Sequence, residues 1–342
     1  MAEIMFKSGG ALSTIQDLGR IGYQQIGMPV AGVMDSYAAR LANIIVGNEE
    51  SAALIEATLL GPEIEVRGDC LVAITGADMN AAINNIKIAL WKSYRVKAGD
   101  IIKLSGAIKG LRSYLAFSGG VLGDEIMESR STYLKGGIGG FSGRAIKAGD
   151  IVKIGDMAEN IINELDSSLI AQYGGDEISI KAVAGPNDEK FTQKSKDLFF
   201  SQEYKIGARS DRMGIFLEGE TLEFSGESAD ILSSAILMGS IQVANDGLPI
   251  ILMADRQTTG GYAQIATVIT PDLYKLAQAM PGTKVRFQQV TVDEAMELYN
   301  AYEKNFIAAK QLRAKGSQLK SVSFKELNLD GVKHRAIVEE VM

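Results

Sequence analysis

Cysteine and histidine are nearly absent from this chain, which contains one of each in 342 residues. Cys70 has no second thiol with which to form an internal disulfide or a cysteine zinc site, so we expect a reducing compartment and no structural metal. His334 lies close to the C-terminus, where we expect an exposed side chain. The chemistry of the chain is therefore expected to use carboxylates, Arg, Lys, hydroxyls, amides or backbone groups.

An excess of positive charge and long apolar runs are also lacking. The chain has 35 Lys and Arg against 42 Asp and Glu, so it offers no basic field for a phosphate backbone and we exclude nucleic acid as a partner. No apolar run approaches the roughly 20 residues that cross a bilayer, and the first residues lack a basic segment followed by an apolar one. We expect a cytoplasmic protein with no membrane partner.

Apolar residues make up 46% of the sequence and charged residues 23%, which is enough apolar material for about two globular domains. Short strand-like runs separated by Gly and Asp turns dominate the first half, a pattern typical of barrels or sandwiches. They cover residues 64–67, 71–76, 87–91, 101–105, 112–118 and 151–155. The acidic segment 156–177 is the best candidate for a domain boundary.

Helix signals are few. Three shorter helices are predicted over residues 35–47, 187–198 and 270–280. The longest begins at Thr291, which has capping-box spacing to Glu294. Its apolar residues recur every three or four positions: Val292, Ala295, Tyr299, Tyr302, Phe306 and Ala309. After it, alternating runs on both sides of Asp330 and Gly331 predict a C-terminal hairpin.

The first half contains an internal repeat. Arg95-Val-Lys-Ala-Gly-Asp-Ile-Ile-Lys-Leu104 is echoed by Ala145-Ile-Lys-Ala-Gly-Asp-Ile-Val-Lys-Ile154. Each copy places a Gly-Asp turn before an alternating strand, so we predict a duplicated piece of β framework and assign it no chemistry.

Polar residues gather in four patches, the first two of which suggest anion binding. The first patch, residues 14–23 with 32–35, brings Asp35 to a helix start, where free amides suit an anionic ligand or Asp35 simply caps the helix. The second, residues 118–120 with the glycine-rich segment 136–144, has amides that could cradle a phosphate or carboxylate. It lacks the Lys-Ser/Thr of a P-loop, and such a run is more often a mobile loop.

The third patch covers residues 210–214 and the fourth residues 255–262, where an apolar hairpin over 240–245 and 249–254 delivers polar groups at a strand end. The candidate roles are a carboxylate clamp by Arg212 or Arg256, proton or N–H acceptance by Asp211 or Asp255, and amide binding by Gln242 or Gln257. The alternative is that neighbouring Asp and Arg residues pair with each other across a domain interface.

At these patches the sequence resembles the family of 5-oxoprolinase C subunits, also called allophanate hydrolase subunit 2 or the biotin-dependent carboxyltransferase family. The resemblance covers about the first 290 residues and is carried by TIQDLGR, GVMD, TGAD, SDRMG and SIQVANDGLPIILMADRQTTGGY. Ala244 and Ala263 stand where relatives commonly carry proline, a difference in the framework.

The resemblance implies a mainly β fold related to part of the carboxyltransferase domain of urea carboxylase. Two tandem cyclophilin-like β-barrel domains with a few helices are expected at residues 1–165 and 176–290, and a C-terminal helix plus hairpin at 291–342. The implied site has no metal. Its expected catalytic residues are Asp211, Arg212, Asp255 and Arg256, and its expected substrate-binding residues are Gln242, Gln257, Thr258, Tyr262, Gln16, Arg20 and Asp35.

The implied function is that of the C subunit in an ATP-dependent 5-oxoprolinase, which converts 5-oxoproline, ATP and water to L-glutamate, ADP and phosphate. The chain is expected to need the A and B subunits of 5-oxoprolinase for activity, and the resemblance leaves open which of the three binds ATP.

Two other functions stay open. A carboxyltransferase component that moves carboxylate from biotin to a urea-like or amide acceptor would use the same residues, but this chain has no Met-Lys-Met biotin attachment motif. A regulatory protein that antagonises a kinase inhibitor would bind a partner tightly and show no turnover. A prolyl isomerase role has the least support, because a fold does not determine a function.

Overall fold

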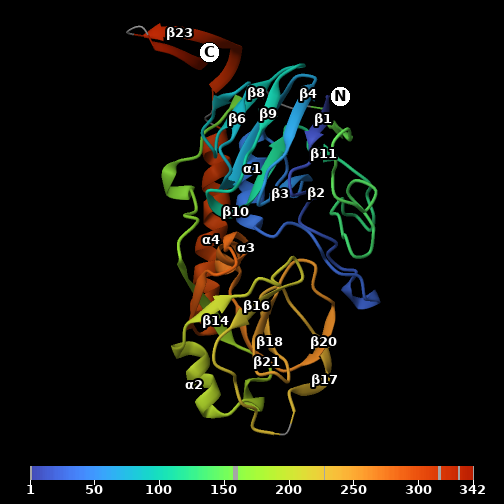
Figure 1. The fold of residues 1–342 in the computed structure, drawn as a ribbon, viewed down its shortest axis with the longest axis vertical. Coiled ribbons are helices and arrows are strands. Elements are labelled where there is room, and N and C mark those ends of the chain that lie inside the picture. The colour runs from blue at the N-terminus through green and yellow to red at the C-terminus, as the bar shows by residue number, and fades with distance from the viewer. Residues whose placement is uncertain (1, 157–160, 227, 315–316, 330–331, 342) are drawn as a thin grey trace. The chain divides into compact units, whose positions relative to one another are not determined.

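The computed structural model describes residues 2–156, 161–226, 228–314, 317–329 and 332–341 (Figure 1). Contacts divide the chain into two compact units, each assembled from separate segments. The first unit contains residues 1–18, 36–172 and 305–342, and the second contains residues 19–35 and 173–304. The domain boundaries given above stay a prediction, and each unit is described separately.

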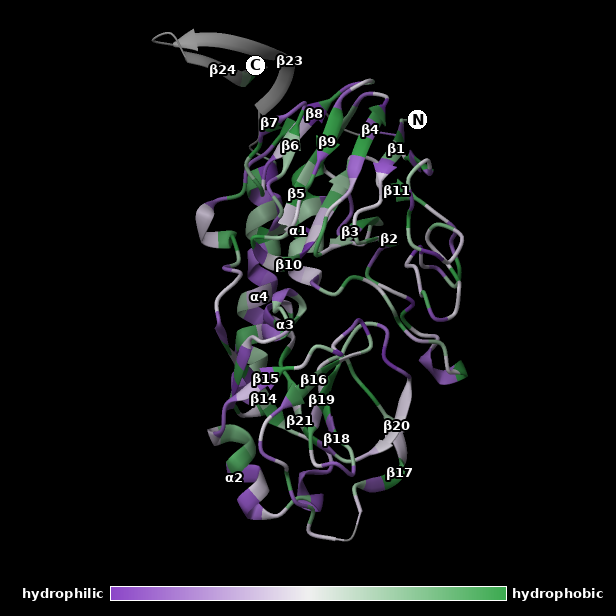
Figure 2. Cartoon of the chain, viewed as in Figure 1, coloured by the Kyte–Doolittle hydropathy of each residue, from purple (hydrophilic) through white to green (hydrophobic). Residues whose placement is uncertain are grey.

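The first unit contains two large sheets. In pairing order, the seven-stranded sheet consists of β11 (Val121–Leu122), β12 (Ile151–Ile154), β1 (Glu3–Ser8), β4 (Glu63–Arg67), β9 (Ile101–Lys103), β6 (Ala82–Ile83) and β7 (Ile86–Lys87). The five-stranded sheet consists of β2 (Leu12–Gln16), β3 (Leu54–Thr58), β10 (Lys109–Phe117), β5 (Cys70–Asp78) and β8 (Ser93–Val96). One apolar core takes residues from both sheets, including Ile4, Ile64 and Phe117, and Figure 2 shows apolar segments along β5 and β9.

The predicted strand 87–91 is wrong beyond its first residue, because β7 ends at Lys87. Trp91 has a left-handed φ of 63°, which a continuous strand does not accommodate. This residue is buried, and its amide donates to the Ile74 carbonyl at 2.9 Å.

The internal repeat folds into two matching turns, which confirms the predicted framework. Gly99 and Gly149 have φ angles of 92° and 89°, a left-handed conformation that glycine adopts without strain. In each copy the Asp carboxylate accepts the amide of the Lys three residues earlier at 2.8 Å. Equivalent turns thus start β9 and β12.

The second unit contains a closed barrel. Its pairing order is β14 (Glu177–Ala184), β21 (Gln264–Val268), β18 (Ser240–Val243), β19 (Pro249–Leu252), β16 (Gly214–Glu218), β15 (Tyr204–Ile206) and β22 (Lys284–Gln289). The predicted hairpin is confirmed by the antiparallel pairing of β18 with β19. A separate two-stranded ribbon pairs β17 (Asp230–Ala235) with β20 (Thr259–Tyr262).

Four α-helices occur in the described ranges: α1 (Ser36–Val46), α2 (Gln193–Ser201), α3 (Leu273–Gln278) and α4 (Val292–Arg313). Short 3-10 turns cover Gln24–Ile26, Ser167–Leu169, Asp188–Lys190 and Thr270–Asp272. The mainly β fold with few helices is therefore confirmed. None of the described helices combines the length and apolar content that a membrane span requires.

The second predicted helix begins later than expected. The segment after Asn187 forms only a 3-10 turn, and α2 begins at Gln193. Thr192 has extended backbone angles and its hydroxyl accepts the Ser195 amide at 3.1 Å, so Thr192 is the residue that caps the helix.

The helix α1 ends as predicted, at Gly47 with a left-handed φ of 85°. A Cβ at this position would lie 2.2 Å from the Arg313 guanidinium at the end of α4. Phe306 of α4 packs edge-on against Tyr37 with ring centroids 5.4 Å apart, and the Arg40 guanidinium lies 3.4 Å from the Phe306 centroid. The C-terminal part of α4 thus completes the first unit.

The capping box of α4 is confirmed, because Thr291 and Glu294 exchange hydrogen bonds between side chains and backbone amides at 2.8 and 3.2 Å. Its predicted apolar stripe is buried only in part, since Val292 is 64% and Tyr299 44% exposed. After α4, β23 (Ser317–Leu329) and β24 (Val332–Val341) form the predicted hairpin, and β23 also pairs with β13 (Ile161–Ile162). The predicted turn at residues 330–331 and the side chain of His334 lie outside the described residues.

Candidate functional site

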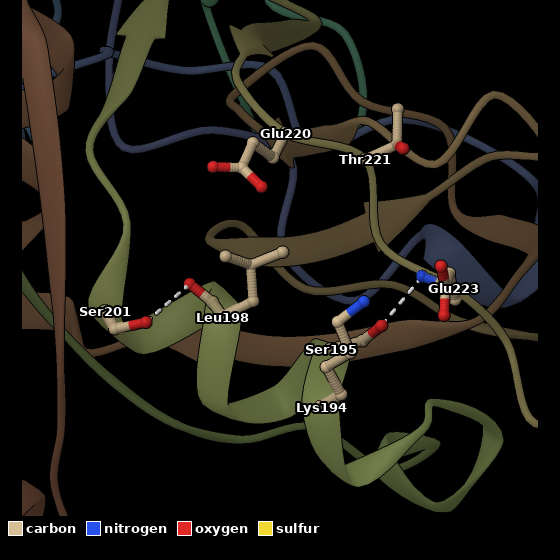
Figure 3. Close-up of a pocket in the computed structure, with 7 residues that line it drawn as sticks. All are labelled: Lys194, Ser195, Leu198, Ser201, Glu220, Thr221 and Glu223. Carbon is tan, nitrogen blue, oxygen red and sulfur yellow. Dashed lines mark hydrogen bonds between the residues drawn. The ribbon is translucent and has the colours of Figure 1, made fainter.

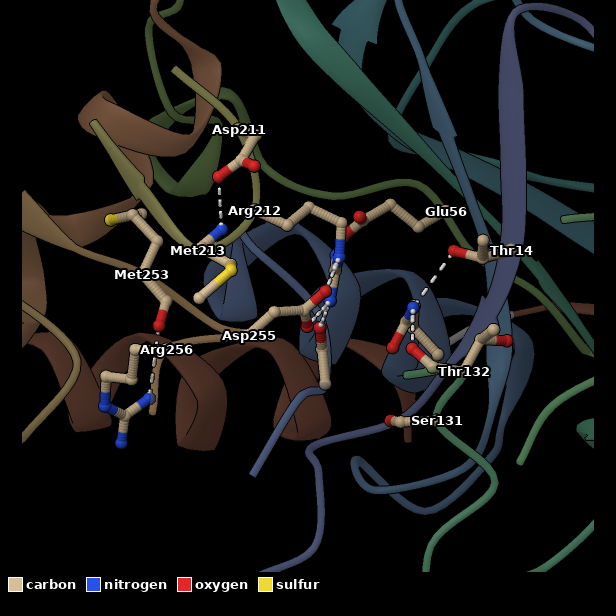
Figure 4. A network of polar contacts seen from close by, with 12 residues as sticks. Thr14, Glu56, Ser131, Thr132, Asp211, Arg212, Met213, Met253, Asp255 and Arg256 are labelled. Atoms are coloured by element: carbon tan, nitrogen blue, oxygen red, sulfur yellow. Dashed lines mark hydrogen bonds and ion pairs between the residues drawn. The ribbon is translucent and has the colours of Figure 1, made fainter. Parts of the chain in front are cut away.

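The loop before β16 exposes the side chain of Asp211 to solvent and buries that of Arg212. Asp211 is exposed, and its carboxylate accepts the amides of Met213 at 2.7 Å and Gly214 at 3.2 Å (Figure 4). These bonds shape the turn into the strand. The structure therefore gives Asp211 a role in the turn, while Arg212 points inward.

Arg212 and Asp255 form a buried ion pair, as Figure 4 shows. The Arg212 Nε and Nη2 atoms donate to the two Asp255 carboxylate oxygens at 3.0 and 2.8 Å, and Nη2 also donates to the Gly32 carbonyl at 2.6 Å. The side chains are each 7% exposed. Arg212 and Asp255 thus pair with each other, as the sequence alternative proposed, but within the second unit and not across a domain interface.

Arg256 follows Asp255 in the sequence but points away from the pair (Figure 4). It is 8% exposed, and its Nε and Nη1 atoms donate to the carbonyls of Ile236 and Met253, both at 3.3 Å. Burial lowers the pKa of Arg256 to about 10, which still leaves it charged at neutral pH. Among the described residues it has no acidic partner.

Two buried glutamines face each other on adjacent barrel strands, Gln242 on β18 and Gln264 on β21. Gln242 Nε2 donates to the Tyr262 carbonyl of β20 at 3.1 Å, and Gln264 Nε2 donates to the Ala235 carbonyl of β17 at 3.3 Å. The pair therefore holds the ribbon onto the barrel. Gln264 was not among the predicted site residues. The sequence feature that could have indicated it is a polar residue within a strand of mostly apolar residues.

The ribbon and the loop before it carry the remaining residues of the fourth patch. Gln257 and Tyr262 are exposed, and Thr258 is half-buried with its carbonyl accepting the Ile236 amide at 3.1 Å. A Cβ at Gly260 would lie 2.4 Å from Ile236 Cδ1 and 2.5 Å from Gln242 Nε2, so a larger residue would require these side chains to move.

The first patch is divided between the two units. Arg20 and Asp35 belong to the second unit, where both are fully buried. Asp35 accepts from Gln278 Nε2 at 2.9 Å. Gln16 belongs to the first unit.

Gln16 is fully buried at the end of β2. Its Nε2 atom donates to Thr14 Oγ1 at 3.0 Å and to the Thr132 carbonyl at 3.1 Å, while Oε1 has no donor among the described residues. The adjacent Asp17, which was not predicted, accepts the Ser129 hydroxyl at 2.7 Å and the Arg130 amide at 2.6 Å. Gln16 and Asp17 therefore hold the segment that leads to the glycine-rich loop.

Comparison with known proteins decides the family. Residues 26–289 match the carboxyltransferase domain, subdomain A and B, family. The chain belongs to this family. It is 36% identical to the 5-oxoprolinase C subunit from Escherichia coli over 87% of this chain and 94% of that protein. The predicted resemblance is confirmed.

Some relatives of this carboxyltransferase-family chain are much longer. The urea amidolyase of Lachancea kluyveri is 33% identical over 85% of this chain but over only 17% of its own length. The crystal structure of the K. lactis urea amidolyase superposes with a TM-score of 0.84 at 28% identity, covering 90% of this chain and 20% of that chain. The chain thus spans about a fifth of the amidolyase structure that it matches.

The glycine-rich loop of the carboxyltransferase-family chain does not fit a phosphate cradle. The amides of Gly137, Gly140 and Gly143 donate to the carbonyls of Leu134, Asp124 and Gly139 at 3.3, 3.1 and 2.8 Å. The Ser142 amide donates to the Asp124 carboxylate at 3.1 Å. Because these amides already donate to acceptors within the protein, they are not available to bind a phosphate.

A hollow beside the helix α2 also lies apart from the predicted residues. This cavity of about 550 Å³ is lined by Lys194, Ser195, Leu198, Ser201, Glu220, Thr221 and Glu223 (Figure 3). The Ser195 hydroxyl accepts a hydrogen bond from the Glu223 amide at 2.7 Å, so this hydroxyl helps to hold the cavity wall together. Within the described ranges, no three His, Cys, Asp or Glu side chains form a group that could hold a metal ion.

Proposed function

We propose that this chain is the C subunit of an ATP-dependent 5-oxoprolinase, acting with the A and B subunits of that enzyme. The observation that carries the proposal is the match in length as well as sequence. The chain covers 94% of the 5-oxoprolinase C subunit from Escherichia coli, but 17% of the Lachancea kluyveri urea amidolyase. The bacterial relative is thus a separate protein of nearly the same length as this chain.

The reaction consumes 5-oxoproline, ATP and water and yields L-glutamate, ADP and phosphate. A five-membered lactam is a stable amide, so its carbonyl must be activated before water opens the ring, and ATP supplies that activation when bound. The residues of this chain would bind and orient the lactam. The ion pair of Arg212 with Asp255 is buried and held by several hydrogen bonds, which suits a positioning role.

The nucleotide is proposed to bind mainly on a partner protein of the complex. The amides of Gly137, Gly140 and Gly143 in the glycine-rich loop already donate to protein carbonyls, and the sequence has no P-loop. This chain would therefore contribute groups for the lactam.

A carboxyltransferase that uses biotin and a urea-like or amide acceptor is the second candidate. The family match over residues 26–289 and the TM-score of 0.84 with the K. lactis urea amidolyase favour it. It would require a separate biotin carrier, and its activity would depend on biotin.

The test is reconstitution. The chain is co-expressed with homologues of the A and B subunits, purified by a tag on this chain, and assayed for glutamate release from 5-oxoproline with and without ATP. We expect both partners to co-purify and glutamate to appear only with ATP and all three proteins. Complexes that lack one of the three proteins serve as the control. A complete complex that opens no lactam would reject the proposal and direct the next assay to biotin.

A further inference from the structure

The Arg256 guanidinium is buried without a counter-charge in the described structure. Its two protein partners are neutral carbonyls at 3.3 Å, those of Ile236 and Met253. A guanidinium has five N–H donors, so this arrangement leaves donors unused. A buried cation held only by neutral groups is unfavourable unless a ligand brings the opposite charge.

The neighbouring arginine shows the contrast within the same unit. Arg212 donates hydrogen bonds from two nitrogen atoms to the Asp255 carboxylate and a further one to the Gly32 carbonyl. It is committed to the protein. Of the two arginines that the sequence offered as a carboxylate clamp, the geometry leaves this task to Arg256.

A single carboxylate suits this position better than a polyphosphate. One guanidinium supplies one positive charge and binds a carboxylate through two parallel N–H···O bonds. The residues whose carbonyls hold it, Ile236 and Met253, are apolar and 4% and 0% exposed. A guanidinium shielded from water in this way suits a small organic acid with a single carboxylate.

We propose that Arg256 binds the carboxylate of the substrate, a small cyclic lactam that carries one carboxylate group. The inference rests on the proposed function, because 5-oxoproline combines a lactam with a carboxylate. Arg256 is thereby the residue that distinguishes the acid from a neutral lactam.

The test compares ligands that differ only in this group. Isothermal titration of the full chain uses 5-oxoproline, 2-pyrrolidinone, which is the same ring without the carboxylate, and inorganic phosphate. The variants are Arg256→Met and Arg256→Lys, and Arg209→Met, an exposed arginine of the same unit, is the matched control for net charge. The same variants are assayed for KM and kcat in the complex with the A and B subunits.

We expect the unmodified chain to bind 5-oxoproline at least about tenfold more tightly than 2-pyrrolidinone, since a charge-assisted bidentate bond is lost with the carboxylate. Arg256→Met should remove this preference, Arg256→Lys should retain part of it, and Arg209→Met should leave it unchanged. In the complex, Arg256→Met should raise KM for 5-oxoproline about tenfold or more, with a smaller effect on kcat.

An Arg256→Met chain that keeps the preference and an unchanged KM overturns the inference while leaving the oxoprolinase function intact. Binding of phosphate that depends on Arg256, or equal affinity of the unmodified chain for 5-oxoproline and 2-pyrrolidinone, also overturns it. If the complex opens no lactam but Arg256-dependent carboxylate binding persists, the proposed function fails and the carboxylate site stands.

Discussion

At the scale of single residues, Arg212 and Arg256, two of the buried arginines of the second unit, have opposite relations to stability. Arg212 neutralises a buried carboxylate at 2.8 and 3.0 Å, whereas Arg256 is held by carbonyls alone. Removing one partner of a buried pair leaves an uncompensated charge, while removing an unpaired cation removes a desolvation cost.

We therefore predict that Arg212→Met lowers the free energy of unfolding by about 3 kcal/mol, because Asp255 is left buried and unpaired. Arg256→Met should leave it unchanged or raise it by about 1 kcal/mol, since it removes an unpaired buried charge. Urea unfolding of the isolated chain at pH 7 measures both. A large loss of stability in Arg256→Met would show that its carbonyl contacts are structural and would weaken the case for a ligand role.

At the scale of elements, the repeated turns show how local chemistry starts a strand. Both copies use a left-handed glycine and an Asp that accepts a Lys amide, but only Asp150 also pairs with an arginine in the described structure. Arg144 donates to the two Asp150 oxygens at 2.7 and 2.9 Å. This pairing holds the pKa of Asp150 below its usual range.

A carboxyl whose pKa is lower in the folded than in the unfolded state stabilises the fold above the unfolded pKa, and this contribution is lost as pH falls through the folded pKa. Asp150→Asn should thus lower the free energy of unfolding at pH 7 by less than about 1 kcal/mol, since solvent screens a partly exposed pair. The difference from the unmodified chain should shrink below about pH 4, where the unfolded carboxyl is protonated. Unfolding curves between about pH 7 and pH 3 test this, with Arg144→Met expected to show the same pH dependence. A difference that is constant with pH would assign the effect to the turn alone.

At the scale of the whole molecule, each compact unit takes segments from both halves of the chain. The first unit includes residues 305–342, and the second includes residues 19–35. Phe306 is 1% exposed and packs on Tyr37 in the first unit. The neighbouring Asn305 donates a hydrogen bond to the Tyr37 hydroxyl, although the two residues are 268 positions apart in the sequence. Each unit therefore has buried residues that come from the other half of the chain, such as Phe306 in the first unit and Met34 in the second.

We predict that the fragments 1–172 and 173–342, expressed separately, lack cooperative thermal unfolding, because each unit would miss a buried segment. Circular dichroism melting of each fragment, with the full chain as the control, makes the measurement. A cooperative transition in the isolated fragment 1–172 would contradict the expectation and show that residues 305–342 are dispensable for that unit.

Local sequence signals predicted many of the helices, strands and turns correctly. Capping at Thr291, the glycine that ends α1, the Asn-Asp-Gly hairpin and the repeated turns depend on neighbours in sequence, and the structure confirms each of them. The helix at Asn187 was misplaced because Thr192 offers a better cap a few residues later. The family could also be recognised from the sequence, because its motifs are long and specific.

The composition of the sequence by itself determined that histidine and cysteine chemistry have little place here, and its motifs determined the family and the mainly β fold. Only the tertiary structure decided which polar residues serve the protein and which remain for a ligand. It paired Arg212 with Asp255 across 43 positions, joined Gln242 to the ribbon and closed the glycine-rich loop on itself, but left Arg256 with carbonyls. The physical reason is that the partner of a buried charge is set by three-dimensional packing, which sequence adjacency does not reveal.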